Sequence, residues 1–205
     1  MKDWVAWISW SIMLREFVDL SLALLTISRH GGYQAGPNYR PINNQTTEEW
    51  DTVFRTNGMG LTRTCGMPHT FASLCLFFTT RTAVPLLPPG SSLIYTVSDV
   101  ARLPPSQAVP YAASKAAIVS IIRSLSNQLA SRGIRVNGVA PGLTYSPFLA
   151  ATGMTTEDIS NPSRYPMRRI EQPVELSPVY VDLAEESKTY VTGHIWGDAG
   201  GRFGF

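Results

Sequence analysis

Apolar residues recur at helical spacing in the middle of the chain. They occupy positions i, i+3, i+4, i+7 and i+11 of one stretch and are Ile118, Ile121, Ile122, Leu125 and Leu129. This spacing places them on one face, so we predict a helix that begins near Ala112. Arg132 in the last turn and Gly133 directly after it are typical of a helix end.

Short apolar runs rich in β-branched residues lie on either side of this helix. Residues 92–97 precede it, and residues 134–140 follow it and end at Pro141-Gly142. We interpret both runs as buried strands, the second with its exit loop. Residues 20–27 predict a further buried strand, and residues 190–196 predict the last strand.

Two more stretches predict helices. Residues 46–57 open with a capping threonine and an acidic first turn, and Trp50, Val53 and Phe54 give them an apolar face. Residues 173–184 form the second helix, with Pro173 suited to its first turn.

The start of the chain is atypical. Residues 1–29 contain tryptophans at positions 4, 7 and 10 and two apolar runs, neither long enough alone to span a membrane. We interpret the segment as a short amphipathic helix followed by the strand at residues 20–27. A membrane-surface segment is the alternative.

A second irregular stretch covers residues 58–75. It shows no clean periodicity, and Gly66 and Pro68 would break a helix, so we predict an insertion. Cys65, His69 and Cys75 lie within it, but they lack paired-cysteine spacing and an evident fourth ligand. No metal site is therefore predicted.

Composition narrows the choice of partners. The 205 residues suffice for one domain with a proper core, and 44% hydrophobic against 16% charged residues is ordinary globular composition. A net charge of +2 without a basic run or an aromatic-interleaved patch predicts no nucleic-acid partner. The two cysteines give no disulfide framework and favour a reducing compartment. We therefore predict a cytoplasmic protein without a membrane partner.

The long helix carries a pair of residues with a specific chemical use. Tyr111 and Lys115 are four positions apart, so on a helix they share one face. A free phenol has a pKa near ~10 and is a poor base at neutral pH, but a neighbouring ammonium favours the phenolate and so helps general acid–base catalysis. Ser98 follows a predicted strand, where open α/β sheets place their chemistry. A surface pair on an ordinary helix is the alternative for the tyrosine and lysine alone.

Together these residues resemble the short-chain dehydrogenase/reductase family. The resemblance rests on Tyr111-x-x-x-Lys115, on a serine thirteen positions before the tyrosine, on the run at residues 135–142 and on the run at residues 190–201. It covers roughly residues 31–201. It implies an α/β fold: a Rossmann-like parallel sheet with flanking helices, in one domain over residues 1–205.

The resemblance also implies catalytic roles. Tyr111 would donate or accept the proton, Lys115 would lower the pKa of the phenol and bind the ribose hydroxyls, and Ser98 would polarise the substrate carbonyl. Asn57 matches the family's helix asparagine, which holds a proton-relay water beside the lysine. A simple helix C-cap before Gly58 is the alternative reading of Asn57.

The cofactor implied is NADP or NAD, with NADP slightly favoured. Besides Asn57, Tyr111 and Lys115, the implied cofactor-binding residues are Pro141, Gly142, Thr144 and Ser146. The last two would hold the nicotinamide carboxamide and the phosphates. The partners implied are a small-molecule substrate and, by resemblance only, further copies of the chain.

No glycine-rich turn of the dinucleotide-binding kind is found in the sequence. Its expected context is a strand before and a helix after, and none of the glycine groups at residues 32–36, 58–60 or 200–204 has it. The sequence therefore predicts a chain without the family's first strands and with residues 20–27 at the edge of the sheet.

Two functions remain open from the sequence. The first is an NAD(P)-dependent oxidoreductase that interconverts a carbonyl and an alcohol on a small organic substrate. The second is a catalytically inactive, truncated relative that acts through a partner or a membrane surface.

Overall fold

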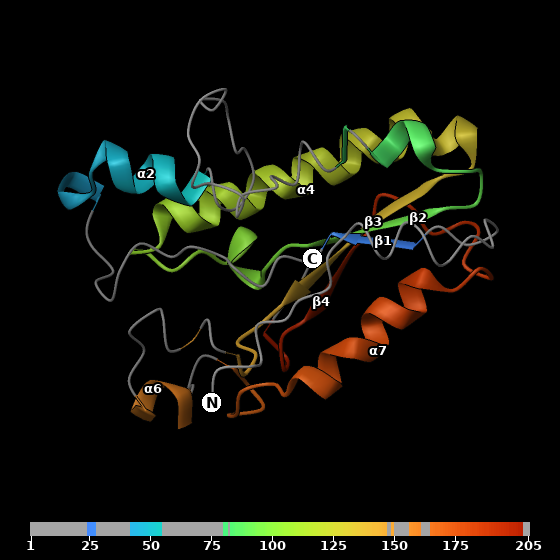
Figure 1. Cartoon of the computed structure of the whole chain (residues 1–205). Coiled ribbons are helices and arrows are strands. Elements are labelled where there is room, and N and C mark those ends of the chain that lie inside the picture. The colour runs from blue at the N-terminus through green and yellow to red at the C-terminus, as the bar shows by residue number, and fades with distance from the viewer. Residues whose placement is uncertain are drawn as a thin grey trace, which may run out of the picture.

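The computed structural model describes residues 24–27, 42–54, 80–81, 83–146, 149, 156–160 and 165–202. Within them lies a sheet of four parallel strands in the order β1 (Leu24–Ile27), β2 (Ser92–Thr96), β3 (Arg135–Pro141) and β4 (Ile195–Asp198). Helices cover both faces (Figure 1). The predicted α/β class with a parallel sheet and flanking helices is confirmed.

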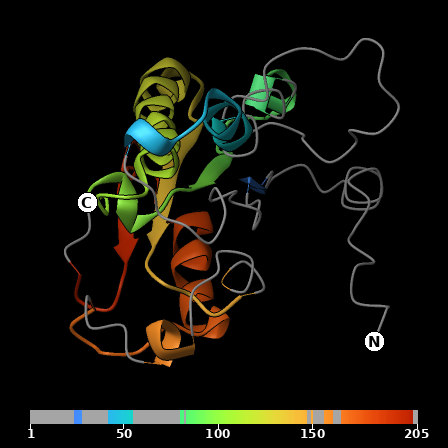
Figure 2. The same cartoon turned by 90° about the vertical axis from the view of Figure 1, so that its left-hand side faces the viewer.

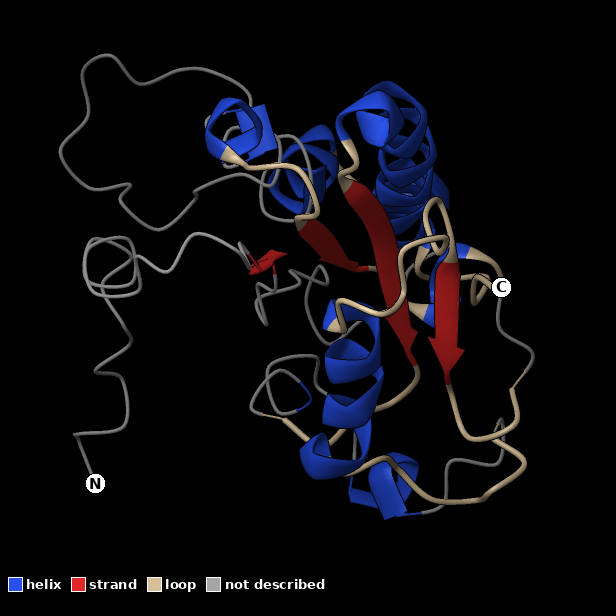
Figure 3. Cartoon of the chain, turned by 90° about the vertical axis from the view of Figure 1, so that its right-hand side faces the viewer, coloured by secondary structure: helices blue, strands red, loops and turns tan. Residues whose placement is uncertain are grey.

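The long helix α4 (Val109–Leu129) lies on one face of the sheet, and α7 (Pro173–Ala184) lies on the other (Figure 2). The helix α2 (Thr47–Phe54) packs beside α4, and α6 (Thr156–Ser160) is a short helix between β3 and α7 in the chain (Figure 3). Among the described residues, no helix is both long and apolar enough to cross a membrane.

Strand alternation divides the core in two. Leu93 and Tyr95 of β2 pack in the cluster beneath α4, whereas Ile94 packs in the cluster beneath α7. This is expected because successive side chains of a strand point to opposite faces. The predicted helix stripe also lies on the sheet, since Ile118, Ile122 and Leu129 are buried.

The end of the long helix agrees with the prediction. After α4 a short 3₁₀ helix, η5 (Ala130–Arg132), leads to Gly133, which has φ 68° and is a left-handed cap.

The predicted helix at residues 173–184 is confirmed by α7. The capping threonine is confirmed too: Thr46 Oγ1 accepts the Glu49 N–H at 3.2 Å, and the Glu49 carboxylate accepts the Thr46 N–H at 2.9 Å.

The predicted start of the last strand is wrong. β4 begins at Ile195, and residues 190–194 are not a strand; the left-handed conformation of Gly193, with φ +74°, bends the chain just before β4. This segment still binds β3, through the Gly193 N–H on the Val136 carbonyl at 2.7 Å and the Asn137 side chain on the Val191 carbonyl at 2.8 Å. His194 is exposed, and its ring packs edge-on against Trp196.

The first strand confirms part of the predicted edge strand at residues 20–27. β1 covers four of the predicted residues 20–27, pairs with β2 and is an outer strand among the described residues. The rest of residues 1–29 and the predicted insertion at 58–75 lie outside the described residues.

Gly138 sets how closely α4 approaches the sheet. A Cβ there would lie 2.7 Å from Ile122 Cδ1, 3.0 Å from Ile195 Cδ1 and 3.1 Å from Val97 Cγ2. All three neighbours are core side chains with little room to move, so any side chain at this position overpacks the core.

We predict that Gly138→Ala lowers the free energy of unfolding by about 1–3 kcal/mol in a urea titration, because the added methyl group overpacks the core. Ile122→Val removes the closest atom. The double variant should therefore be less destabilised than the sum of the two single variants. Strict additivity would contradict this account of the close approach.

Candidate active site

The carboxyl end of β2 meets the first turns of α4. The Lys115 ammonium, in the second turn, donates to the Thr96 carbonyl at the end of β2 over 3.3 Å. Ser98 follows two residues later and precedes a short 3₁₀ helix, η4 (Asp99–Ala101), which packs against α4. The structure thus brings Ser98, Tyr111 and Lys115 to one end of the sheet.

The ammonium of Lys115 is buried, with only 6% of the residue exposed. Burial lowers the pKa of Lys115 to about 8. Among the described residues no carboxylate forms an ion pair with it, and the centroid of the Tyr111 ring lies 5.8 Å from Nζ. At neutral pH the site therefore holds a cation beside the ring of Tyr111.

We call Ser98, Tyr111 and Lys115 together the trio. Local structure fixes the backbone of Tyr111 and the side chain of Ser98. Tyr111 stands in the first turn of α4 after the buried Pro110, and its carbonyl accepts the Ser114 hydroxyl at 2.7 Å. Ser98 is 8% exposed and caps η4, where its oxygen accepts the Val100 N–H at 3.5 Å and its hydroxyl donates to Asp99 at 3.3 Å. The catalytic roles of the three residues stay predictions.

Asn57 lies outside the described residues. The helix predicted to lead to it is confirmed over Thr47–Phe54 and packs against α4 (Figure 1).

The predicted cofactor-binding residues line the exit of β3. Pro141 ends the strand, and the Gly142 N–H donates to the Asp198 carbonyl at 2.7 Å. A Cβ on Gly142 would lie 2.8 Å from the Tyr165 ring and 2.9 Å from Ala199 Cα, so the close packing here requires glycine. The half-buried Ser146 follows, four residues later.

The hydroxyl of Thr144 has a protein partner that the sequence did not predict. Thr144 Oγ1 donates to Glu171 Oε2 at 2.7 Å, and the two residues form an isolated parallel bridge. Around it the Tyr145 N–H donates to the Glu171 carbonyl at 2.8 Å, and the Glu171 N–H donates to the Leu143 carbonyl at 2.9 Å. Since the hydroxyl proton is engaged, Thr144 offers a ligand only its oxygen lone pairs.

A cavity of about 320 Å³ opens beside this bridge, between the ends of β3 and β4. Gly142, Glu171 and Asp198 line it, whereas the trio does not. Burial raises the pKa of Glu171 to about 7, the hydrogen bond from Thr144 opposes this shift, and the Asp198 and Glu175 carboxyls add to it. Glu175 itself is paired with Arg169 at 2.7 Å. The cavity thus has an acidic lining, borders the predicted cofactor-binding residue Gly142, and does not include Ser98, Tyr111 or Lys115.

Sequence reasoning missed Glu171 and also missed a buried cluster behind Ser98. There Asp99 is bound by Arg202 and Tyr165, which lie far from it in the chain. The one signal in the sequence was the placement of a carboxylate directly after the predicted catalytic serine.

Comparisons with known proteins settle the family. A family model described as enoyl-(acyl carrier protein) reductase matches residues 69–201. The chain belongs to the short-chain dehydrogenase/reductase family. The resemblance to that family, predicted from Ser98, Tyr111, Lys115 and the runs at residues 135–142 and 190–201, is confirmed.

Relatives of this short-chain dehydrogenase/reductase are named as oxidoreductases. The chain is 45% identical over 127 residues to the uncharacterized oxidoreductase YghA of Escherichia coli, covering 62% of this chain and 43% of the relative. It is 43% identical over 127 residues to the chloroplastic NADPH-dependent aldehyde reductase 1 of Arabidopsis thaliana, covering 61% and 44%. The chain therefore spans less than half the length of these two relatives.

The structural likeness extends further along the chain. A short-chain dehydrogenase/reductase of Brucella melitensis, described as a glucose/ribitol dehydrogenase, superposes with a TM-score of 0.69 at 27% identity, covering 88% of this chain and 64% of that one. The predicted Rossmann-like sheet is the fold of this family.

We predict a pH signature of the buried lysine. Its pKa in the folded chain, about 8, lies below the 10.5 of a free lysine, so the unfolded chain binds more protons between these pH values. The free energy of unfolding of the wild type, relative to Lys115→Met, should therefore rise by up to about 3 kcal/mol from pH 8 to pH 10.5.

Lys188→Met is the matched control for this experiment, because Lys188 is a partly exposed lysine paired with Asp182 at 2.8 Å. Urea titrations at several pH values would compare the three proteins. Parallel curves for the wild type and Lys115→Met would contradict the burial of the ammonium.

For Glu171 we predict that the free energy of unfolding falls, rather than rises, as the pH increases in a lower range. Its pKa in the folded chain, about 7, is raised from 4.5, so the stability that the protonated carboxyl contributes is complete below pH 4.5 and is lost as pH rises through 7. Relative to Glu171→Gln, the wild type should lose about 1–2 kcal/mol over this range, because solvent screens the half-exposed carboxyl. Glu48→Gln, on the exposed side of α2, is the control and should show no such loss.

Proposed function

We propose that the chain carries the catalytic centre of an oxidoreductase that interconverts a carbonyl and an alcohol on a small organic substrate, with NADP preferred over NAD. The observation that carries the proposal is the buried ammonium of Lys115 beside the ring of Tyr111, at the carboxyl end of β2. Among the described residues this cation has no carboxylate partner, and a buried cation without one lowers stability, which is typical of a functional site.

The residues present fit the nicotinamide half of the cofactor. An ammonium has three N–H donors, and among the described residues Lys115 uses one of them, on the Thr96 carbonyl, so the others could bind ribose hydroxyls. At the exit of β3, next to the closely packed Gly142, the lone pairs of the Thr144 hydroxyl could accept the carboxamide N–H, and the Ser146 hydroxyl could donate to the phosphates. When bound, the cofactor would supply or accept the hydride.

The chain's own residues would handle the proton and the oxygen. In reduction, the Tyr111 hydroxyl would give its proton to the carbonyl oxygen as the carbonyl carbon gains the hydride, which completes the alcohol. The ammonium of Lys115 would stabilise the phenolate left behind. The Ser98 hydroxyl would donate to the same oxygen while negative charge develops on it, and Asn57 would order the proton relay.

Two relatives support the class of substrate. One is named an NADPH-dependent aldehyde reductase, and the Brucella structure is described as a glucose/ribitol dehydrogenase. We infer an aldehyde or a polyol as the substrate, in a cytoplasmic enzyme that forms homo-oligomers.

We predict that NADPH binds the purified chain, as followed by its fluorescence, and that NADPH oxidation in the presence of glyceraldehyde requires the trio. Tyr111→Phe should keep cofactor binding but lose at least about 100-fold in turnover, because it removes the proton donor. Lys115→Met should weaken both binding and turnover. Tyr190→Phe is the matched control, since that side chain is fully exposed and Tyr190 precedes the amino end of β4, whereas the trio lies at the carboxyl end of β2.

The outcomes separate the two candidate functions. No binding of NADPH or NADH at millimolar concentration would favour the inactive relative that acts through a partner or a membrane surface. Full turnover by Tyr111→Phe would refute the assignment of the proton donor.

A further inference from the structure

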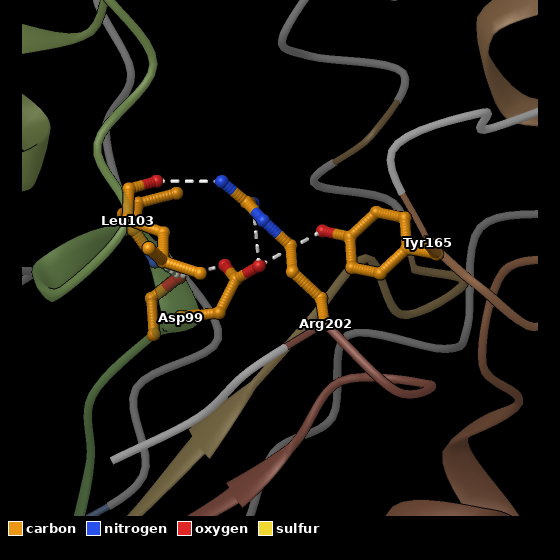
Figure 4. Close-up of polar contacts among 6 residues, drawn as sticks. Asp99, Leu103, Tyr165 and Arg202 are labelled. Atoms are coloured by element: carbon orange, nitrogen blue, oxygen red, sulfur yellow. Dashed lines mark hydrogen bonds and ion pairs between the residues drawn. The ribbon is translucent and has the colours of Figure 1, made fainter.

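A buried carboxylate stands directly behind the proposed catalytic serine. Asp99 is 3% exposed, and its two oxygens have different partners. Oδ1 accepts the Ser98 hydroxyl at 3.3 Å, whereas Oδ2 accepts the Arg202 guanidinium at 2.7 Å and the Tyr165 hydroxyl at 3.2 Å (Figure 4).

The partners of Asp99 come from the far end of the chain. Arg202 follows β4, and its second terminal nitrogen donates to the Leu103 carbonyl at 2.6 Å. Its guanidinium carbon lies 5.8 Å from the centroid of the Tyr165 ring, which in turn packs on Gly142. Two segments beyond β3 are therefore bound to the loop that carries Ser98 (Figure 4).

This arrangement bears on the proton of Ser98. A serine hydroxyl has one proton, and here that proton points to Asp99. To polarise a substrate carbonyl, Ser98 must give the same hydrogen bond to the carbonyl oxygen, so Asp99 competes with the substrate. At 3.3 Å the serine bond is the longest of the three that Asp99 accepts from described residues. The ion pair on the opposite oxygen, only 15% exposed at Arg202, withdraws negative charge from the carboxylate.

We propose that Asp99 is a positioning residue for Ser98, and that Arg202 sets how strongly Asp99 holds the serine proton. With Arg202 in place, the hydrogen bond from the Ser98 hydroxyl to Asp99 is weak, and the hydroxyl turns readily to a substrate oxygen. Without Arg202 an uncompensated buried carboxylate retains the proton. The catalytic consequence rests on the proposed function, but the electrostatic coupling does not.

A thiol at position 98 tests the coupling without any turnover. Ser98→Cys is made in a Cys65→Ser/Cys75→Ser background, which removes the only two native cysteines. The rate of alkylation by iodoacetamide as a function of pH gives the pKa of the introduced thiol, because only the thiolate reacts.

Adding Arg202→Gln should raise the pKa of that thiol and slow its alkylation at pH 7.5 by about tenfold, since the charge of Asp99 then opposes thiolate formation. Adding Asp99→Asn as well should restore the rate to within about twofold of the Ser98→Cys protein, because one pKa unit corresponds to tenfold. Arg132→Gln is the matched control. Arg132, like Arg202, donates through both terminal nitrogens, but its acceptors are the Val84 and Leu87 carbonyls, so its loss should leave the rate unchanged.

If the role of Arg202 were merely structural, Arg202→Gln would change the alkylation rate in the opposite direction. Loosening of the loop would expose the thiol and speed its alkylation at every pH, and Asp99→Asn would not reverse it. Either of these results, or an unchanged rate in Arg202→Gln, would overturn the proposal. Thermal unfolding of each variant would show which proteins are folded at the assay temperature.

The catalytic arm uses the chain with Ser98 intact, NADPH and glyceraldehyde. Arg202→Gln should lower kcat about tenfold with little change in the KM for NADPH, and Asp99→Asn should reverse this loss. If the wild type turns over no aldehyde, the proposed function fails while the thiol measurement still decides the coupling. If the thiol rate is insensitive to Arg202 in an active enzyme, only the coupling fails.

Discussion

The ammonium of Lys115 is the constraint around which the site is built. A charged amino group taken out of water lowers stability unless it has a partner, and here the described partner is a backbone carbonyl at the end of β2. The bond requires that β2 end where α4 makes its second turn. It also places the cation beside the ring of Tyr111. The position of the Lys115 ammonium, the burial of its charge and its closeness to the Tyr111 ring therefore follow from one packing arrangement.

The rest of the fold keeps that arrangement rigid. Gly138 allows α4 to lie close on β3, and the core residues of β2 fill the space between helix and sheet. On the other face, the buried Arg135 donates to the Leu183 and Glu185 carbonyls, which fixes the end of α7 to β3. The sheet that presents the carboxyl ends of β2 and β3 is thus held from both sides, as in open α/β folds that bind ligands at this edge.

The sequence predicted the elements with strong local signals and missed the polar contacts between distant segments. The periodic isoleucines and Gly133 located α4 and its end, and the β-branched run located β3. The start of β4 was wrong because the left-handed conformation of Gly193 interrupts an otherwise strand-like run. Asp99 and Arg202 are 103 positions apart, and Thr144 and Glu171 are 27 apart, so no local pattern could pair them. The trio itself was predicted only through its family resemblance, since spacing alone did not distinguish Tyr111 and Lys115 from a surface pair.

Titration of the Lys115 amino group tests the central claim most directly. The chain contains only three lysines, at positions 2, 115 and 188, so NMR of ¹³Cε-labelled lysine would give three signals, and Lys115→Met would assign one of them. The account predicts that this signal titrates with a pKa of about 8. A titration at the ordinary lysine value near ~10.4 would mean a solvated ammonium and would contradict the account.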